Sequence, residues 1–331
     1  MKALVYDGAK DIEYREETDP QVGASEVLLQ VEAAGICGSD LHVYFGHDSR
    51  RVPPLVLGHE VVGVIESGKR AGERVLVNPF ITCGHCRYCT TGRSNICPNR
   101  QLIGLQRLGG FAEHLAIPER NLISVPDALD ATVAVLAEPL AASVHAFGLA
   151  ARAWCCPLAE AKVLVLGGGA VGLSAALLLR HQHVAELLLG ETNPERRHLA
   201  IKEGIPAYDP RTTEVPPGHF DIVFDAVGAG ATRASALAAI ADGGVIIHTG
   251  LQDNEGRIDM RKVTLSEVTI IGTYAYTQKD LAAALAAVHS GVLGTLDWVD
   301  HRPMANGAAA FAELAEGRSR MAKIVLLPQG D

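Results

Sequence analysis

The chain has 331 residues and a formal net charge of -9, which is enough length for two ordinary domains with a core in each. An acidic chain offers nucleic acid no overall electrostatic attraction. With 48% hydrophobic and 20% charged residues, the composition is typical of a folded globular protein rather than a disordered one. No apolar run reaches the roughly 18 residues that a membrane span needs. The N-terminus also lacks the apolar segment of a secretory signal. The sequence therefore predicts a cytoplasmic protein with neither nucleic-acid nor membrane partners.

Up to about residue 140 the chain is a series of short, β-rich segments broken by Gly, Pro and Asn. This spacing predicts a compact β-barrel or sandwich. The segments expected to form strands are 26–35, 61–67, 73–79, 111–118 and 121–126.

The pattern then changes to one of helices and buried strands. Residues 131–151 have the length and Ala/Leu content of a helix, in which Pro139 predicts a break. From Lys162 to Tyr274, continuous apolar strands alternate with helical segments, which predicts a doubly wound parallel sheet. The last fifty or so residues predict two helices and a closing strand. Periodicity leaves open whether these extend the sheet or pack on the first domain.

A glycine-rich loop opens this second region. In "VLVLGGGAVG", Gly167, Gly169 and Gly172 have G-x-G-x-x-G spacing directly after a strand and before a helix. The three glycines allow a tight turn, close approach of a pyrophosphate, and close packing of helix on strand. Free N–H groups at the helix start, which includes Ala170 and Val171, favour an anion there. The loop predicts a dinucleotide site.

Glu191 ends the next strand, 19 residues after Gly172, where a carboxylate can bind the adenosine ribose. The alternative is that Glu191 only caps the following helix. A carboxylate at this position repels a 2′-phosphate, so NAD is favoured over NADP. Arg196 and Arg197 lie one helical turn further on and leave that preference open, because they are either phosphate ligands or solvated helix charges.

Four of the seven cysteines lie in "TCGHCRYCTTGRSNIC". Four thiolates complete a tetrahedral zinc shell and leave no position for a substrate, so this run predicts a structural zinc lobe. A nucleic-acid zinc ribbon is the competing reading, and the acidic net charge argues against it. The zinc ligands are expected to be Cys83, Cys86, Cys89 and Cys97.

A catalytic zinc needs three protein ligands and one exchangeable position. Candidates lie upstream, with Cys37 in a Gly-rich turn and His59 and Glu60 at the start of a strand. All three residue types bind zinc, but their spacing in the sequence does not establish that they converge.

Taken together and in order, "GICGSDLH", "LGHE", the cysteine lobe, "EPLA", "GGGAVG" and "GTYAYT" resemble the zinc-dependent medium-chain dehydrogenases over essentially the whole chain. The sorbitol (polyol) and threonine dehydrogenase branch is the most similar. The resemblance implies an α/β fold with a GroES-like β-barrel catalytic domain (1–140), a Rossmann NAD-binding domain (141–277) and a C-terminal segment (278–331) that returns to the catalytic domain.

The resemblance also implies a reaction and its residues. Hydride passes between a secondary alcohol, such as a polyol, and NAD. Cys37, His59 and Glu60 match the ligands of a catalytic zinc, so that each chain would bind one catalytic and one structural zinc. Glu138 matches a carboxylate that holds the zinc-bound water or joins the zinc shell, and Ser39 and His42 match a proton relay.

The substrate is open between a polyol, L-threonine, a sugar phosphate and another secondary alcohol. Ala275-Tyr276 stands where sorbitol dehydrogenases carry Arg-Tyr, which puts sorbitol itself in doubt. We expect the pocket to be lined by Tyr44, His114, Tyr274 and Tyr276.

Two rival functions fit these motifs less well. A zinc-free quinone reductase of the same fold would lack both cysteine sets. A zinc-ribbon protein that senses NAD would need neither an open metal site nor a proton relay. The resemblance also implies a homodimer or homotetramer. The strands in "GVIIHTGL" and "EVTIIGTY" are candidates for pairing with the same strand of a second subunit.

Overall fold

The protein is described here by a computed structural model of residues 1–329, which forms two compact units. Within the described residues, the first unit contains Met1–Pro139, Thr277–Ser290 and residues 299–329, and the second contains Leu140–Tyr276 and Gly291–Trp298. The C-terminal segment is thus divided between the units, whereas the sequence analysis assigned all of 278–331 to the catalytic domain. Gly291–Trp298 stays with the second unit because Thr295 N donates to Glu203 Oε1 over 3.1 Å and Trp298 is buried.

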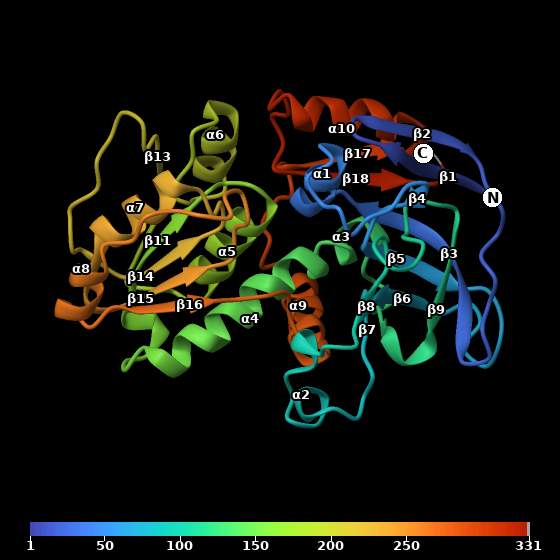
Figure 1. Ribbon diagram of the computed structural model, residues 1–331, viewed down its shortest axis with the longest axis horizontal. Coiled ribbons are helices and arrows are strands. Elements are labelled where there is room, and N and C mark those ends of the chain that lie inside the picture. The colour runs from blue at the N-terminus through green and yellow to red at the C-terminus, as the bar shows by residue number, and fades with distance from the viewer. Residues whose placement is uncertain (330–331) are drawn as a thin grey trace. The chain divides into compact units, whose positions relative to one another are not determined.

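The first unit is built on mostly antiparallel sheets (Figure 1). One has the order β2-β1-β4, and the larger one has the order β10-β6-β5-β3-β18-β17, with β9 also paired to β3. Its strands are β1 (Lys2–Gly8), β2 (Asp11–Glu16), β3 (Glu26–Gly35), β4 (Leu55–Val56), β5 (Glu60–Ile65), β6 (Arg74–Val77), β7 (Phe80–Ile81), β8 (Gln101–Leu102), β9 (His114–Pro118), β10 (Leu122–Ser124), β17 (Val299–Pro303) and β18 (Lys323–Leu327). Its helices are α1 (Gly38–Tyr44), α2 (Arg87–Thr90), η1 (Ser94–Ile96), η2 (Glu119–Asn121), α3 (Ala131–Ala134), α9 (Gln278–His289), η4 (Met304–Asn306) and α10 (Gly307–Ala315).

The C-terminal strands complete this unit. β18 pairs with β3 through Val325 and Gly35, and β17 lies parallel to β18. The ring of Phe311 on α10 lies edge-on to Phe111, with centroids 5.9 Å apart, in the hydrophobic core. The closing strand therefore belongs to the first unit, a choice that periodicity left open. β17 was not predicted, because Asp300, His301 and Arg302 interrupt any apolar pattern.

The second unit is a six-stranded parallel sheet of order β13-β12-β11-β14-β15-β16. This order is that of a doubly wound Rossmann sheet. Its elements are η3 (Leu158–Glu160), β11 (Lys162–Leu166), α5 (Ala170–His181), β12 (Glu186–Gly190), α6 (Pro194–Lys202), β13 (Ala207–Tyr208), β14 (Phe220–Asp225), α7 (Gly230–Ala239), β15 (Ile240–His248), α8 (Met260–Leu265) and β16 (Thr269–Gly272).

Helices cover both faces of this sheet. Neighbouring residues of a strand point to opposite faces, and β14 shows both. Val223 packs in a cluster with Leu237 of α7, while the Phe224 ring stacks on Phe147 of α4 (Ala137–Ala153) with centroids 5.3 Å apart. The strands are apolar on both faces, which is why they read as continuous hydrophobic runs.

Helix α4 differs from its predicted form. The break lies between α3 and Ala137, and Pro139 is in the first turn of α4, where a helix has no partner for the missing N–H. Residues 131–153 also have the length and composition of a membrane span, contrary to the expectation that none would. In the structure 67% of the most apolar window is buried, as in the core helix of a soluble protein, so this helix is weak evidence for a membrane.

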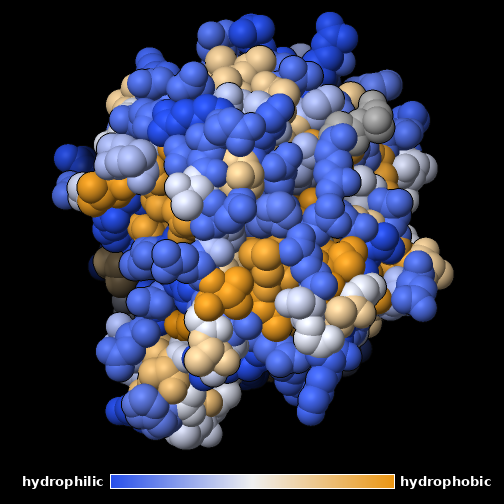
Figure 2. All heavy atoms as spheres, turned by 90° about the vertical axis from the view of Figure 1, so that its right-hand side faces the viewer, coloured by the Kyte–Doolittle hydropathy of each residue, from blue (hydrophilic) through white to orange (hydrophobic). Residues whose placement is uncertain are grey.

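The surface on the side of the first unit that carries the N-terminus is mostly hydrophilic, with the largest group of hydrophobic residues in the lower middle of the view and a smaller group at its left (Figure 2).

Candidate metal and dinucleotide sites

The turn between β3 and α1 positions Cys37. Cys37 is the N-cap of α1, and its backbone N donates to Asp40 Oδ2 over 3.1 Å. Because the Asp40 side chain is fully buried, this bond fixes the turn from inside. Cys37 is thereby held at the end of a rigid strand rather than on a loose loop.

His59 and Glu60 enter the same region from the start of β5. Gly58, directly before them, has φ +91°, and a Cβ there would lie 2.6 Å from the Phe111 ring. Only glycine suits that backbone and that contact. One ligand atom from each of Cys37, His59 and Glu60 lies within 4.8 Å of the others. The structure thus brings together three residues whose convergence the sequence left open.

This cluster fits a zinc ion. Its donors are a thiol sulfur, an imidazole nitrogen and a carboxylate oxygen, which are the atoms zinc prefers. Glu60 is fully buried, and Glu60 Oε1 has no hydrogen-bond partner. A buried carboxylate oxygen without a partner is costly, and a cation at the cluster would remove that cost.

Asp40 supports His59 from behind. Asp40 Oδ1 lies 3.5 Å from His59 Nδ1, which leaves Nε2 as the ring nitrogen for a metal. Burial alone would raise the pKa of Asp40, but His59, Arg51 and the Cys37 amide together lower it. Burial alone would lower the pKa of His59, but Asp40 and Cys37 raise it well above its ordinary value. A carboxylate behind a ligand histidine is a common device for orienting the ring.

Lys323 supports Glu60 in a similar way. This buried lysine of β18 forms an ion pair with Glu60 Oε2, and its Nζ donates to Ile36 O over 2.8 Å. Ile36 precedes Cys37, so one ammonium group contacts both the carboxylate and the cysteine turn. The C-terminal strand therefore contributes directly to the cluster.

The other expected catalytic residues are placed as follows. Ser39 and His42 are three positions apart on α1, where side chains lie on one face of a helix. Glu138 is in the first turn of α4 and is buried, but it is not part of the group formed by Cys37, His59 and Glu60.

The cysteine lobe is closed at its base by the β7–β8 hairpin and tied to the barrel by Arg120, which donates to Thr82 O over 2.8 Å. Zinc–sulfur bonds of about 2.3 Å in a tetrahedron require sulfur atoms roughly 3.8 Å apart. The recorded Sγ–Sγ distances are 3.5, 3.6, 3.8 and 3.9 Å, for the pairs Cys86–Cys89, Cys83–Cys97, Cys86–Cys97 and Cys83–Cys89. The four sulfurs have the spacing of a closed zinc shell.

The thiols of the lobe differ in pKa. The amides of His85 and Cys86 lower the pKa of Cys83 to about 6, which favours the thiolate that binds zinc. Burial and the neighbouring thiols raise the pKa of Cys89 to about 11. Cys155 and Cys156 are exposed, lie after α4, and belong to neither cysteine cluster.

The glycine loop has the geometry expected of a dinucleotide site. Gly167 has φ +100°, and a Cβ on Gly172 would lie only 1.8 Å from Gly167 O. A Cβ on Gly169 would meet no atom within 4 Å, so the space that a pyrophosphate would enter is open. Gly169 is the N-cap of α5, and Ala170 and Val171 form its first turn.

Glu191 is directed at this loop. Its Oε2 accepts a hydrogen bond from Gly168 N over 2.7 Å, and its Oε1 accepts one from Asn193 N over 2.7 Å. The N-cap of α6 is Asn193, whose side chain accepts from Glu195 N and Arg196 N. The capping role considered for Glu191 therefore belongs to Asn193.

The two arginines near Glu191 differ in their hydrogen bonds and ion pairs. Arg197 donates to Glu191 O and Thr192 O, each over 2.8 Å, and pairs with Asp209. Arg196 lies in the first turn of α6, and its Nε is buried without a hydrogen-bond partner.

The four residues expected to line a substrate pocket have different surroundings. Tyr44 is buried in the core, with its ring centroid 5.6 Å from that of Phe311, which gives no support to a pocket role. His114 Nε2 lies 3.0 Å from Glu66 Oε1. In the second unit, Tyr276 is buried and Tyr274 is partly exposed.

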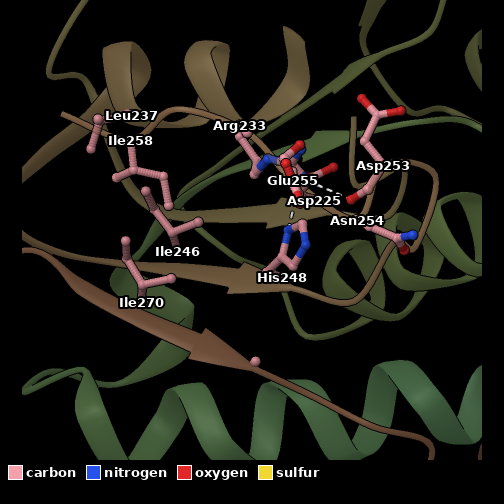
Figure 3. A pocket seen from close by; sticks show the side chains of 12 residues that line it. Asp225, Arg233, Leu237, Ile246, His248, Asp253, Asn254, Glu255, Ile258 and Ile270 are labelled. Atoms are coloured by element: carbon pink, nitrogen blue, oxygen red, sulfur yellow. Dashed lines mark hydrogen bonds and ion pairs between the residues drawn. The ribbon is translucent and has the colours of Figure 1, made fainter. Parts of the chain in front are cut away.

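A cavity of about 290 Å³ in the second unit was not foreseen. It has an apolar end formed by Leu237, Ile246, Ile258 and Ile270 and a polar end that includes Arg233 and His248 (Figure 3).

Asp225 organises the polar end of this cavity. It accepts bonds from Val227 N, Gly228 N and Thr232 Oγ1 and lies 3.2 Å from His248 Nδ1. This buried carboxylate holds the turn from β14 to α7.

Sequence reasoning also missed Asp40 and Lys323. A charged residue next to a predicted ligand was the available signal for Asp40, which lies within "GICGSDLH". Lys323 is 286 residues from Cys37 in the chain, and no local pattern shows that it is buried.

Comparison with known proteins agrees with this arrangement. Residues 23–127 match the alcohol dehydrogenase GroES-like domain, and residues 170–290 match the zinc-binding dehydrogenase domain. The chain is 32% identical to an L-threonine 3-dehydrogenase of Streptomyces avermitilis, over 98% of this chain and 99% of that one. It is 30% identical to the L-galactonate-5-dehydrogenase of Escherichia coli, over 97% and 95% of the two chains.

A solved structure is similar throughout. An alcohol dehydrogenase from Escherichia coli CFT073, in complex with NADH, has a TM-score of 0.89 and 26% identity, with 99% of each chain covered.

Proposed function

The chain belongs to the zinc-dependent medium-chain dehydrogenases and is an NAD-dependent oxidoreductase of secondary alcohols, and we propose that Cys37, His59 and Glu60 form its catalytic centre. The observation that carries this proposal is the convergence of their ligand atoms within 4.8 Å of one another in the first unit, where His59 and Glu60 are buried. The product of the reaction is the corresponding ketone.

The protein residues fix the geometry of this centre. Zinc, when bound there, supplies a Lewis acid that lowers the pKa of the substrate hydroxyl. Asp40 holds the His59 ring, and Lys323 holds the Glu60 carboxylate, so neither ligand has to reorganise. Three protein donors leave room for an exchangeable oxygen, which is the pattern of a catalytic rather than a structural site.

Ser39 and His42 supply the proton path in this proposal. A hydroxyl can take the substrate proton and give up its own to an imidazole, and the two side chains share one face of α1. Glu138 provides a buried carboxylate on the same unit. Its proposed role is to hold water or to join the metal ligands during the reaction.

The glycine loop and Glu191 hold the cofactor. NAD, when bound there, would supply the acceptor for the hydride of the carbinol carbon. Gly167, Gly169 and Gly172, with Ala170 and Val171, present the start of α5 to the pyrophosphate. Glu191 would accept hydrogen bonds from the adenosine ribose, with Arg196 beside it.

We assign the second zinc to Cys83, Cys86, Cys89 and Cys97. Their spacing matches a four-thiolate shell, and such a shell fixes a loop without taking part in chemistry. Each chain would then bind two zinc ions with different roles.

The substrate is a small secondary alcohol. A polyol is the first choice, and L-threonine and sugar phosphates or related alcohols are the alternatives. The pocket residues proposed for it remain Tyr44, His114, Tyr274 and Tyr276, of which the buried Tyr44 has the least support.

We further propose a cytoplasmic homodimer or homotetramer. β16 is an edge strand of the parallel sheet, and its Ile270 is exposed, as is Leu265 of α8 nearby in the chain. An exposed apolar edge strand favours pairing with a second copy. The net charge of -9 gives no support to a nucleic-acid partner.

The experiment is a panel of secondary alcohols, comprising polyols, L-threonine, aldonates and sugar phosphates, assayed for NAD reduction by the purified protein with and without a chelator. We expect activity on at least one alcohol that the chelator abolishes and zinc restores. Alcohol oxidation that withstands removal of all zinc would contradict the proposed centre.

A further inference from the structure

Two consecutive arginines follow α1, and the fold treats them differently. Arg50 remains at the surface, where its Nε and Nη2 each donate to Asp48 over 2.7 Å and its side chain is 66% exposed. The Arg51 side chain turns inward and is only 3% exposed. Burying a guanidinium costs free energy unless the group is hydrogen-bonded or paired with an opposite charge. The groups that contact the Arg51 side chain therefore matter.

Arg51 reaches the helix that carries the expected proton relay. Its Nη1 donates to Ser39 O over 3.1 Å and lies 4.0 Å from Asp40 Oδ1. Its Nε is buried without a hydrogen-bond partner. Arg51 therefore lies behind α1, in contact with the carboxylate that faces His59.

The buried carboxylate of Asp40 lies between two positively charged or ionisable side chains. Within residues 1–329, the ion-pair partners recorded for Asp40 are Arg51 and His59. His59 is itself a proposed metal ligand, whereas the Arg51 guanidinium is always protonated in proteins. Arg51 is therefore the permanent cation beside the fully buried Asp40 carboxylate.

We propose that Arg51 is a positioning residue for the catalytic metal: it holds Asp40 against His59 and so keeps the His59 ring directed at the metal. This inference rests on the proposed function, because it takes Cys37, His59 and Glu60 as the zinc ligands. Arg51 itself does not touch the ligands or the substrate in this account. Its effect passes through Asp40.

The test compares Arg51→Met with Arg50→Met, a matched surface control, in the zinc-loaded full-length protein. Zinc content per chain is measured by elemental analysis after dialysis against a graded series of chelator concentrations. Outer-shell partners of zinc ligands typically change metal affinity by about 10–100-fold, so Arg51→Met should lose one of two zincs at correspondingly lower chelator concentration. Arg50→Met should match the wild type.

Two further variants distinguish a positioning role of Arg51 from a merely structural one. Arg51→Lys keeps a cation but not the guanidinium geometry, and it should recover part of the lost affinity; it also serves as the test if Arg51→Met does not fold. The double variant Arg51→Met/Asp40→Asn should bind zinc like Asp40→Asn alone, because both changes act on one path. Additive losses in the double variant, or wild-type zinc retention in Arg51→Met, would overturn the inference.

The same zinc measurements distinguish failure of the proposed catalytic centre from failure of the Arg51 proposal. If Cys37→Ser retains as much zinc as the wild type, the catalytic centre itself is misplaced, whatever Arg51 does. If Cys37→Ser loses one zinc and Arg51→Met does not lose it more easily, only the role of Arg51 is wrong.

Discussion

The carboxylate of Glu191 accepts a hydrogen bond from the backbone N of Gly168 over 2.7 Å, and this links the end of β12 to the glycine loop after β11. A second bond, from Asn193 N to Glu191 Oε1, holds the other oxygen. The carboxylate is buried and hydrogen-bonded through both oxygens, and a 2′-phosphate next to it would be repelled by its negative charge. Cofactor choice is therefore expected to depend on this one side chain.

Glu191→Ser should weaken NAD binding and reduce discrimination against NADP. A hydrogen bond to a charged group contributes about 1.5–3 kcal/mol, which corresponds to roughly a 10–100-fold change in the ratio of kcat/KM for NAD to that for NADP. Steady-state kinetics with both cofactors checks this. The control is Glu195→Ser, because Glu195 is exposed on α6; an unchanged ratio in Glu191→Ser would contradict the assignment.

The glycine loop offers a pair of substitutions that should differ in their effect on stability. Gly172→Ala places a methyl group 1.8 Å from Gly167 O, and overpacking of this kind costs about 1–3 kcal/mol. We expect a lower melting temperature and poor NAD binding. Gly169→Ala meets no protein atom within 4 Å, so the fold should be unchanged.

The methyl group of Gly169→Ala would nevertheless occupy the space proposed for the pyrophosphate. We expect a raised KM for NAD at an unaltered melting temperature, measured by differential scanning fluorimetry and kinetics. If both variants changed the melting temperature and the KM for NAD to the same extent, the loop would not separate a packing glycine, Gly172, from a cofactor-facing glycine, Gly169.

The zinc lobe should stabilise the protein without taking part in the chemistry. Cys89→Ala removes one of four thiolates, and we expect loss of one zinc per chain and a lower melting temperature. A loss of about 2 kcal/mol would shift the midpoint by roughly 4–8 °C for domains of 150–250 residues. The remaining folded protein should keep its kcat.

The control for the lobe is Cys156→Ala, an exposed cysteine outside both clusters. It should change neither zinc content nor melting temperature. If Cys89→Ala keeps its zinc and its stability, the four cysteines do not form the shell described here.

Lys323→Met should show whether the negative charge of Glu60 is balanced by Lys323, by a bound metal or by both. Removing one partner of a buried ion pair costs about 3–5 kcal/mol, because the Glu60 carboxylate is left buried without a cation. Zinc at the cluster would supply another positive charge. We therefore expect a larger loss of melting temperature in metal-free protein than in zinc-loaded protein.

Lys202→Met is the matched control, since Lys202 pairs with Asp297 at the surface. Its melting temperature should differ little from that of the wild type with or without zinc. A loss in Lys323→Met that is identical in both metal states would argue against a cation next to Glu60.

Several parts of this molecule follow from local sequence patterns. The glycine loop, the apolar strands of the second unit and the cysteine lobe each depend on neighbouring residues, so spacing alone predicts them. Two alternatives left open were decided by the structure, because both depend on contacts rather than on pattern. Asn193 rather than Glu191 caps α6, and β18 closes the first unit by pairing with β3.

The parts that escaped prediction depend on long-range burial. Lys323, Arg51 and Asp40 are charged residues, which a composition rule assigns to the surface. The fold buries each of them beside a partner brought from another segment. Tyr44, an aromatic residue expected to line a pocket, is also buried through a long-range contact, because it packs against Phe311 in the core.

The most direct test of the central claim is zinc content and NAD reduction in Cys37→Ser, measured on the same folded preparation with an alcohol that the wild type oxidises. The account predicts that one zinc per chain is lost, that the zinc of the cysteine lobe remains, and that alcohol-dependent NAD reduction falls to background. Wild-type activity in a variant that has lost that zinc would contradict it.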